Sequence, residues 1–277
     1  MIIVIESGST KADWRSVSDD GTVRSLRTAG MNPLHQTYED IKGVVSKAVP
    51  ELNPDGRSVN AIYFYGAGIL SPAVAEPLVS ALNLWCPFAH VECESDLVAA
   101  SRALFGNGTG VAAILGTGAN SCMWENGRIV SAIRTGGYIL GDEGSGAVLG
   151  KMFLADYIKG LVPEPLASEF AEEYGLDYAA IVTKVYKQES PSRFLASFAR
   201  FVIENRGDEY AAGLIRRNLR SFVERVLSRY ECRRIGVVGS VGTACKDELI
   251  EIGQEYGLEF VRFIQSPIDE LLKYHGI

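Results

Sequence analysis

Two Gly-rich hairpins of the same design place the strongest constraint on the fold and the ligand of this chain. Residues 114–124, ILGTGANSCMW, read as an apolar strand, a turn of small residues and a second strand that ends in Trp. Residues 5–14, IESGSTKADW, repeat that order near the start of the chain. A turn of Gly, Ser and Thr exposes backbone N–H groups and hydroxyls with little side-chain bulk, so phosphate oxygens can approach closely. One such hairpin is usually only a turn, whereas a pair of them favours binding of one polyphosphate by both hairpins.

The length and charge of the chain narrow the class of ligand. A chain of 277 residues is long for a single core, so we expect two domains. The net charge of −7 argues against a protein that binds the phosphate backbone of nucleic acids, because such proteins need a basic surface. We therefore expect a small-molecule ligand and no nucleic-acid partner.

The first residues, the apolar runs and the cysteines indicate the cellular compartment in which the protein is expected. The first residues show no basic segment followed by a cleavage site, and no apolar run reaches the length of a membrane span. The five cysteines are odd in number and lack C-x-x-C spacing, which disfavours a disulfide framework and a zinc site. We expect a cytoplasmic protein with no membrane partner and with reduced, mostly buried thiols.

Hydrophobic spacing predicts the element order βββαβαβα for the first hundred residues, which indicates a sheet-centred α/β fold. The predicted elements are strands at 2–5, at 11–18 and ending near 28, a helix at 34–49 closed by Pro50 and Pro54, a strand at 61–65, a helix capped by Ser71, a strand at 90–94 and a helix to 105.

The second half repeats this plan with a helical insertion, which indicates a duplicated domain. The predicted elements there are the hairpin, a strand at 129–134, mostly helix at 147–230, a strand at 235–238, a helix at 243–256, a strand at 259–263 and a closing helix after Pro267. With a boundary at 106–108, we expect a first domain at 1–107 and a second at 108–266. We expect the closing segment, 267–277, to join the first domain.

Asp96 follows a predicted strand and begins a helix, a place where ligands bind in sheet-centred folds. A carboxylate there can accept the proton of a substrate hydroxyl that attacks a γ-phosphoryl group. The alternative is an Asp that only favours the helix N-terminus, and the two interpretations are evenly balanced. Glu94 lies on the same side of the strand and stays a competing candidate.

Two further acidic positions are candidates for sugar and metal contacts. Asp142 and Glu143 stand in GDEGSG, at 141–146, where a carboxylate can bind a sugar hydroxyl and, through water, a magnesium ion. The alternative is a helix start with acids in its first turn, but the glycines favour close approach by a ligand. Glu6, at the tip of the first strand, can hold hydrated magnesium, whereas Lys11 is favoured as a solvated turn lysine.

An Arg-rich stretch in the helical middle is a weaker signal. Acidic residues such as Glu209 and Glu224 are interspersed in the stretch that contains Arg216, Arg220 and Arg225, which favours a solvated helix face over a nucleic-acid site.

Together the hairpins, the Asp96 segment and the GDEGS loop resemble the sugar-kinase, hsp70 and actin superfamily. Within it the chain is similar to the N-acetylglucosamine kinase group, which is related to the BadF/BadG-type ATPases. ESGSTKADW resembles the first phosphate motif, LGTGANS the second and VVGSVG the adenosine-side motif. The resemblance covers almost the whole chain and implies two ribonuclease-H-like (actin-like ATPase) domains of mixed α/β sheets with an interdomain cleft. It implies that sugar binds mainly to the first domain and ATP mainly to the second.

The resemblance also implies an activity and roles for single residues. The expected activity is ATP- and Mg²⁺-dependent phosphorylation of an amino sugar, with the 6-OH of N-acetylglucosamine as first choice, Asp96 as general base and Glu6 as metal ligand. The resemblance is also compatible with a homodimer of this chain. The candidate sugar-binding residues are Asn32, Gly66, Ala67, Thr117, Gly118, Asn120 and Asp142. The candidate nucleotide-binding residues are Gly8, Ser9, Thr10, Lys11, Gly116, Thr117, Gly239, Ser240 and Gly242.

Two departures from the family pattern keep other functions open. The first motif usually opens with Asp, and Glu6 stands there, with a carboxylate displaced by one methylene. Ala12 replaces a common Thr. The alternatives are a kinase for another amino sugar such as glucosamine and a sugar-sensing regulatory protein with little turnover. A third alternative is an ATPase that activates an iron–sulfur enzyme. Such relatives hold a shared iron–sulfur cluster through paired cysteines, and the cysteines of this chain do not match that pattern.

Overall fold

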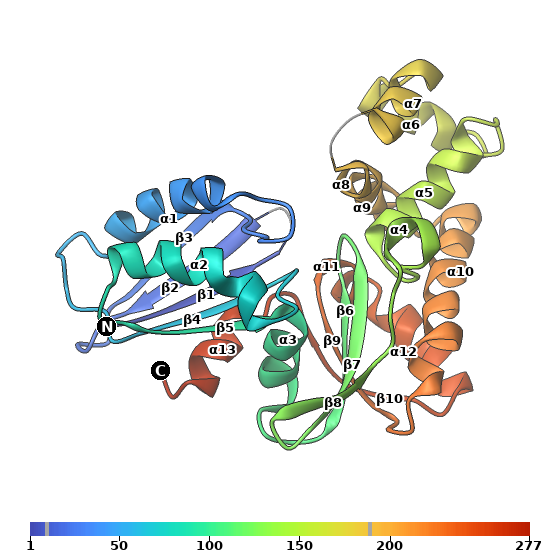
Figure 1. Cartoon of the computed structure of the whole chain (residues 1–277). Coiled ribbons are helices and arrows are strands. Elements are labelled where there is room, and N and C mark those ends of the chain that lie inside the picture. The colour runs from blue at the N-terminus through green and yellow to red at the C-terminus, as the bar shows by residue number, and fades with distance from the viewer. Residues whose placement is uncertain (9–10, 188–189) are drawn as a thin grey trace. The chain divides into compact units, whose positions relative to one another are not determined.

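The chain divides into two compact units, each built on one sheet (Figure 1). The computed structural model describes residues 1–8, 11–187 and 190–277. Unit 1 comprises Met1–Asn107 and Pro267–Ile277, and unit 2 comprises Gly108–Ser266.

The elements of unit 1 are β1 (Ile2–Ser7), β2 (Lys11–Val17), β3 (Val23–Ala29), α1 (Tyr38–Leu52), β4 (Ala61–Gly66), α2 (Pro72–Trp85), β5 (His90–Ser95), α3 (Asp96–Phe105) and α13 (Ile268–Tyr274). The elements of unit 2 are β6 (Gly110–Leu115), β7 (Ala119–Glu125), β8 (Arg128–Ala132), α4 (Gly137–Leu140), α5 (Gly146–Tyr157), α6 (Leu166–Tyr174), α7 (Tyr178–Tyr186), α8 (Pro191–Ser197), α9 (Ala199–Glu204), α10 (Glu209–Arg225), the 3-10 helix η1 (Leu227–Arg229), β9 (Arg234–Val238), α11 (Ser240–Ala244), α12 (Lys246–Glu255) and β10 (Glu259–Ile264).

The two sheets have the same topology. The strand order is β3-β2-β1-β4-β5 in unit 1 and, read in the matching direction, β8-β7-β6-β9-β10 in unit 2. In both sheets the first strand of the unit pairs antiparallel with the second and parallel with the fourth. The predicted repeat of one plan is therefore confirmed, and the helices α4 to α10 form the insertion between β8 and β9.

Alternation along β1 sorts its side chains between the two faces of the unit 1 sheet. Ile3 and Ile5 are fully buried in the cluster that also contains residues of α1 and α2, and Trp14 of β2 joins them. Figure 1 shows α1 and α2 on one face of this sheet and α3 and α13 on the other. Because side chains alternate with period two, Glu6 projects to the face that carries α3 and α13.

Two helix predictions were wrong in detail. The helix expected at 34–49 begins at Tyr38, because Thr37 caps it in a capping box with Asp40. Pro50 lies inside α1 and does not end it, since burial of Val49 and Leu52 holds the last turn despite the missing N–H.

The helix expected at 243–256 is two helices. α11 ends at Ala244 and α12 begins at Lys246, with Cys245 between them at φ −109° and ψ 31°. Cys245 is fully buried, so the break directs its side chain into the core of unit 2.

Aromatic side chains hold the helical insertion of unit 2 together. The ring of Phe153 on α5 lies 4.8 Å from that of Phe170 on α6 and 5.5 Å from that of Phe201 on α9. Gly150 lets α5 approach α8, because an added Cβ would lie 1.9 Å from the carbonyl oxygen of Leu195. Over the ranges that the structure covers, no helix combines the length and the apolar character needed to cross a bilayer.

Helix α13 belongs to the core of unit 1, which leads to a prediction. Leu271 is fully buried, and α13 packs against α3 and β1. We expect Leu271→Ala to lower the free energy of unfolding by about 2–4 kcal/mol, because it leaves a cavity. Urea denaturation followed by tryptophan fluorescence, to which the buried Trp14 of unit 1 contributes, measures this change.

Lys273→Ala on the same helix is the control. Lys273 is 69% exposed and forms an exposed ion pair with Glu270, so its loss should change stability by less than about 1 kcal/mol. Equal stabilities for the Leu271 and Lys273 variants would contradict the assignment of α13 to the core.

Candidate functional site

The turn between β1 and β2 is closed by its own backbone. The N–H of Gly8 donates to the carbonyl oxygen of Lys11 at 3.0 Å. Ser9 and Thr10, both candidate nucleotide contacts, lie outside the described residues. The ammonium group of Lys11 is about half exposed and lies 3.4 Å from the Asp13 carboxylate, so a structural ion pair accounts for it without a ligand.

Ser7, which the sequence analysis did not single out, joins three candidate segments of unit 1. It is fully buried, its hydroxyl accepts from the Met31 N–H at 2.8 Å and donates to the Met31 carbonyl at 3.1 Å, and its carbonyl accepts from the Ala67 N–H at 3.1 Å. Gly68, at φ +84°, brings the next turn against Asn32, since an added Cβ would lie 2.2 Å from the Asn32 Oδ1. The candidates Asn32, Gly66 and Ala67 are thus brought together at the end of β1.

Asp96 begins α3 directly after β5. Ser95 caps the helix, and the Asp96 Oδ1 accepts from the N–H of Leu97 at 2.9 Å. Burial raises the pKa of Asp96, while the backbone hydrogen bonds oppose that shift. The competing Glu94 instead lies 4.0 Å from Arg102. Of the two carboxylates, Asp96 is the one held by backbone donors.

Glu6 lies among other carboxylates on one face of the sheet. It is paired in register with Asp13 of β2 and with Tyr65 of β4, and directly opposed residues share a face. Burial, then repulsion from Asp13 and Asp96, raises the pKa of Glu6 to about 7, against a lowering effect of Lys11. A bound cation would relieve this repulsion.

The carboxylate oxygens of Glu6 and its acidic neighbours Asp13 and Asp96 are of the ligand type that magnesium prefers. In the part of the chain that the structure describes, no three His, Cys, Asp or Glu side chains form a preformed metal site. Magnesium needs none, because it keeps several waters and is usually held by one or two carboxylates together with substrate phosphates. Glu6 therefore fits as a ligand that acts with phosphate oxygens.

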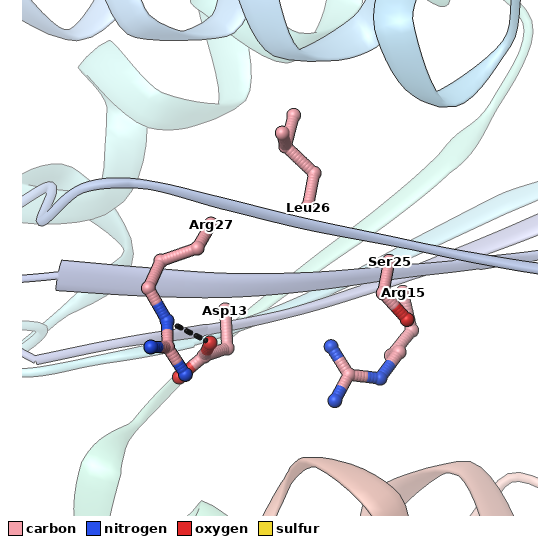
Figure 2. A pocket seen from close by; sticks show the side chains of 5 residues that line it. All are labelled: Asp13, Arg15, Ser25, Leu26 and Arg27. Atoms are coloured by element: carbon pink, nitrogen blue, oxygen red, sulfur yellow. Dashed lines mark hydrogen bonds and ion pairs between the residues drawn. The ribbon is translucent and has the colours of Figure 1, made fainter.

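Asp13 also lines a hollow on β2 and β3. Figure 2 shows the Arg27 guanidinium turned toward the Asp13 carboxylate, with Arg15 and Ser25 on the same side of the strands and the Leu26 side chain pointing to the other side. The Arg27 Nε lies 2.8 Å from the Asp13 Oδ1. Burial alone would raise the pKa of Asp13, but Arg27 and Lys11 bring it below its ordinary value. Asp13 is thus kept ionised on the face that carries Glu6.

In unit 2, the turn at Gly116–Gly118 is called the phosphate turn after the contacts that the sequence predicts for it, and it is tied to helix α5. The N–H of Gly116 donates to the Gly118 carbonyl at 3.0 Å. The N–H groups of Gly146 and Ala147, in the first turn of α5, donate to the carbonyls of Gly116 and Thr117 at 2.8 and 3.0 Å. The carbonyls of the turn are therefore engaged with α5 and with the turn itself.

The acid loop, residues 141–146, places Asp142 against this turn. Asp142 has φ +57°, and its N–H donates to the Thr135 carbonyl at 3.2 Å. Burial raises the pKa of Asp142, while the nearby Thr135 side chain and Ala119 backbone oppose the shift. An added Cβ at Gly118 would lie 2.9 Å from the Asp142 Oδ2. Asn120, on the strand that follows, has an Oδ1 that accepts from the Ser121 N–H at 2.9 Å.

Gly239 brings the adenosine-side motif to the same place in unit 2. It has φ +117°, and an added Cβ would lie 2.3 Å from the carbonyl oxygen of Leu115, directly before the phosphate turn. Gly242 packs equally closely, with an added Cβ 2.4 Å from Val237. Ser240 begins α11 between them. The predicted adenosine-side motif is thus packed directly against Leu115, at the start of the phosphate turn, at a distance that larger side chains would not permit.

Solved structures with similar folds include two presumed N-acetylglucosamine kinases. The one from Porphyromonas gingivalis has a TM-score of 0.95 and 36% identity, over 99% of this chain and 98% of that chain. The one from Chromobacterium violaceum has a TM-score of 0.74 and 19% identity, over 99% and 98%. A ROK family glucokinase from Streptomyces griseus, in complex with glucose and AMPPNP, has a TM-score of 0.57 and 16% identity, over 96% and 94%.

These comparisons confirm the predicted fold class. Two mixed five-stranded sheets in two α/β domains are the actin-like ATPase fold of these neighbours. The second and third neighbours show the fold alone. No protein-family model and no curated protein sequence matches the chain.

The raised pKa of Glu6 predicts a pH dependence of stability. The unfolded chain loses this proton near the ordinary value of 4.5 and the folded chain near 7, so ionisation of Glu6 costs the folded state stability as pH rises between these values. In metal-free buffer, we expect Glu6→Gln to raise the free energy of unfolding above pH 7 by about 3 kcal/mol, with little change below pH 4.5.

Urea denaturation at a series of pH values measures this difference. The control is Glu51→Gln, which makes the same change at an exposed position on α1. If the free energy of unfolding of Glu6→Gln equals that of the wild type at every pH, the Glu6 carboxylate is not destabilised by burial and by neighbouring acids.

Proposed function

Because the chain belongs to the N-acetylglucosamine kinase family of the sugar-kinase, hsp70 and actin superfamily, we propose that it transfers the γ-phosphoryl group of ATP to a hydroxyl of an amino sugar. The proposed acceptor is the 6-OH of N-acetylglucosamine, with glucosamine as the alternative. The observation that carries the proposal is the placement of Asp96, a partly buried carboxyl at the end of β5 that accepts a hydrogen bond from the Leu97 backbone.

Asp96 has the properties of a general base in this reaction. Its raised pKa brings it closer to the pH at which a base works efficiently. As the sugar hydroxyl oxygen forms its bond to the γ-phosphorus, the bond from that phosphorus to the β,γ-bridging oxygen breaks and ADP leaves. The hydroxyl proton passes to the Asp96 carboxylate. Asn32, Gly66 and Ala67, gathered by Ser7, are the proposed sugar contacts of unit 1.

Unit 2 supplies the proposed nucleotide contacts. The phosphate turn and Gly239 present backbone close to one another, which suits phosphate oxygens that must be approached without side-chain bulk. Asp142 and Asn120 lie beside that turn and are the proposed partners of further sugar hydroxyls. Magnesium, held by Glu6 and the phosphates, would neutralise charge on the transferred group.

Replacement of Asp96 by Asn tests the role of the base. Asn keeps the shape and can still accept the Leu97 N–H, so we expect a folded protein. Turnover with ATP, magnesium and N-acetylglucosamine should fall by about 10²-fold or more, because Asn cannot take the proton. Sugar binding, measured by calorimetry, should stay close to that of the wild type.

Glu94→Gln is the matched control, since Glu94 is the competing carboxylate two residues away. We expect it to retain most of the turnover. A near-normal rate in Asp96→Asn, or a larger loss in Glu94→Gln, would remove Asp96 from this role.

A further inference from the structure

A buried polar side chain on α10 faces the acid loop. Asn218 is 2% exposed and stands among apolar neighbours on the buried side of the helix, such as Leu214 and Phe222. Along α10, which the structure describes throughout, it is the one buried position with a polar side chain. Burial of a carboxamide is costly unless its donor and acceptor are both used.

Both ends of the Asn218 amide are used, and both bond to the acid loop. The Gly144 N–H donates to the Asn218 Oδ1 at 2.9 Å, and the Asn218 Nδ2 donates to the Ser145 carbonyl at 3.0 Å. One side chain thus satisfies two backbone groups on consecutive residues, which fixes the direction of the loop as it enters α5.

The loop lies directly on α10 at this point. Gly144 has φ +81°, and an added Cβ would lie 2.9 Å from the Cβ of Phe222 and 3.0 Å from the side chain of Leu115. The backbone of Gly144 is therefore packed between α10 and the strand that leads to the phosphate turn. Only glycine permits both this conformation and this distance.

The fixed segment connects back to Asp142. The Ser145 N–H donates to the Asp142 carbonyl at 3.0 Å, and the Ser145 hydroxyl caps α5 by accepting from the Val148 N–H at 3.2 Å. Since Asn218 holds Gly144 and Ser145, it limits the positions that the Asp142 backbone, at φ +57°, can take. The ion pair of Arg225 with Glu143 adds little, because the Arg225 side chain is 66% exposed.

We propose that Asn218 is a positioning residue that holds Asp142 in place for the sugar. The inference rests on the proposed function, in which Asp142 binds a sugar hydroxyl. In this role, Asn218 makes α10, and thus the helical insertion, contribute to substrate recognition. Asn218 acts through the loop backbone and touches no substrate.

Asn218→Asp separates this role from simple packing, because its effect depends on pH. A protonated Asp can accept from Gly144 and donate to Ser145 as Asn does, whereas an ionised Asp faces the Ser145 carbonyl with a second acceptor. A buried carboxyl titrates above its ordinary range, so the change should fall between about pH 5 and pH 8. We expect the KM for N-acetylglucosamine relative to the wild type to rise about tenfold as pH increases across that window.

The ratio of variant to wild type at each pH isolates this titration. The charged groups around the loop, namely Asp142, Glu143, Lys151 and Arg225, are present in both proteins. The KM for ATP should not follow the same pH profile. Asn205→Asp is the matched control, since the Asn205 amide donates to Phe201 in its own helix and not to the loop.

Asn218→Ser covers the case in which the Asp variant does not fold. It removes both hydrogen bonds without adding a charge, so we expect a raised sugar KM that is independent of pH. A sugar KM equal to that of the wild type in a folded Asn218 variant would overturn the positioning role while leaving the proposed function intact. A wild type without sugar-dependent turnover would overturn both.

Discussion

The attachment of the phosphate turn to the start of α5 is the constraint on which the arrangement of unit 2 depends. Two backbone hydrogen bonds, from Gly146 to Gly116 and from Ala147 to Thr117, join the end of the β6–β7 pair to the helix that follows the acid loop. The loop must therefore close onto the turn, which brings Asp142 within reach of Gly118. Because these bonds use backbone groups, the glycines remain free to present a surface without side-chain bulk.

In unit 1 the corresponding place is organised by side chains. Buried Ser7 ties the end of β1 to the segments that contain Asn32 and Ala67. Burial raises the pKa values of Glu6 and Asp96 there, and repulsion from Asp13 and Asp96 raises that of Glu6 further. Such a group costs stability in the isolated protein, which is typical of sites arranged for a ligand that brings compensating charge.

The sequence predicts the local features of this fold well and the long-range contacts poorly. Alternation and turn residues predict the hairpins and the repeated plan, because these signals lie within a few neighbouring residues. The start of α1 was missed although Thr37 and Asp40, three residues apart, form a local capping signal. The persistence of α1 through Pro50 depends on burial by distant residues, which local spacing does not show. Ser7 and Asn218 were missed for the same reason, since their partners lie 24 and 74 residues away along the chain.

Release of ADP in the presence of ATP and magnesium tests the central claim most directly. The assay is run without sugar and with N-acetylglucosamine, glucosamine, N-acetylmannosamine and glucose in turn. An amino-sugar kinase is expected to release ADP strongly with one amino sugar and only weakly without sugar, since a hydroxyl that is positioned against Asp96 outcompetes water. Release that is absent or equal for every sugar would contradict the account. If calorimetry still detected binding of a sugar, the protein would instead be a sensor.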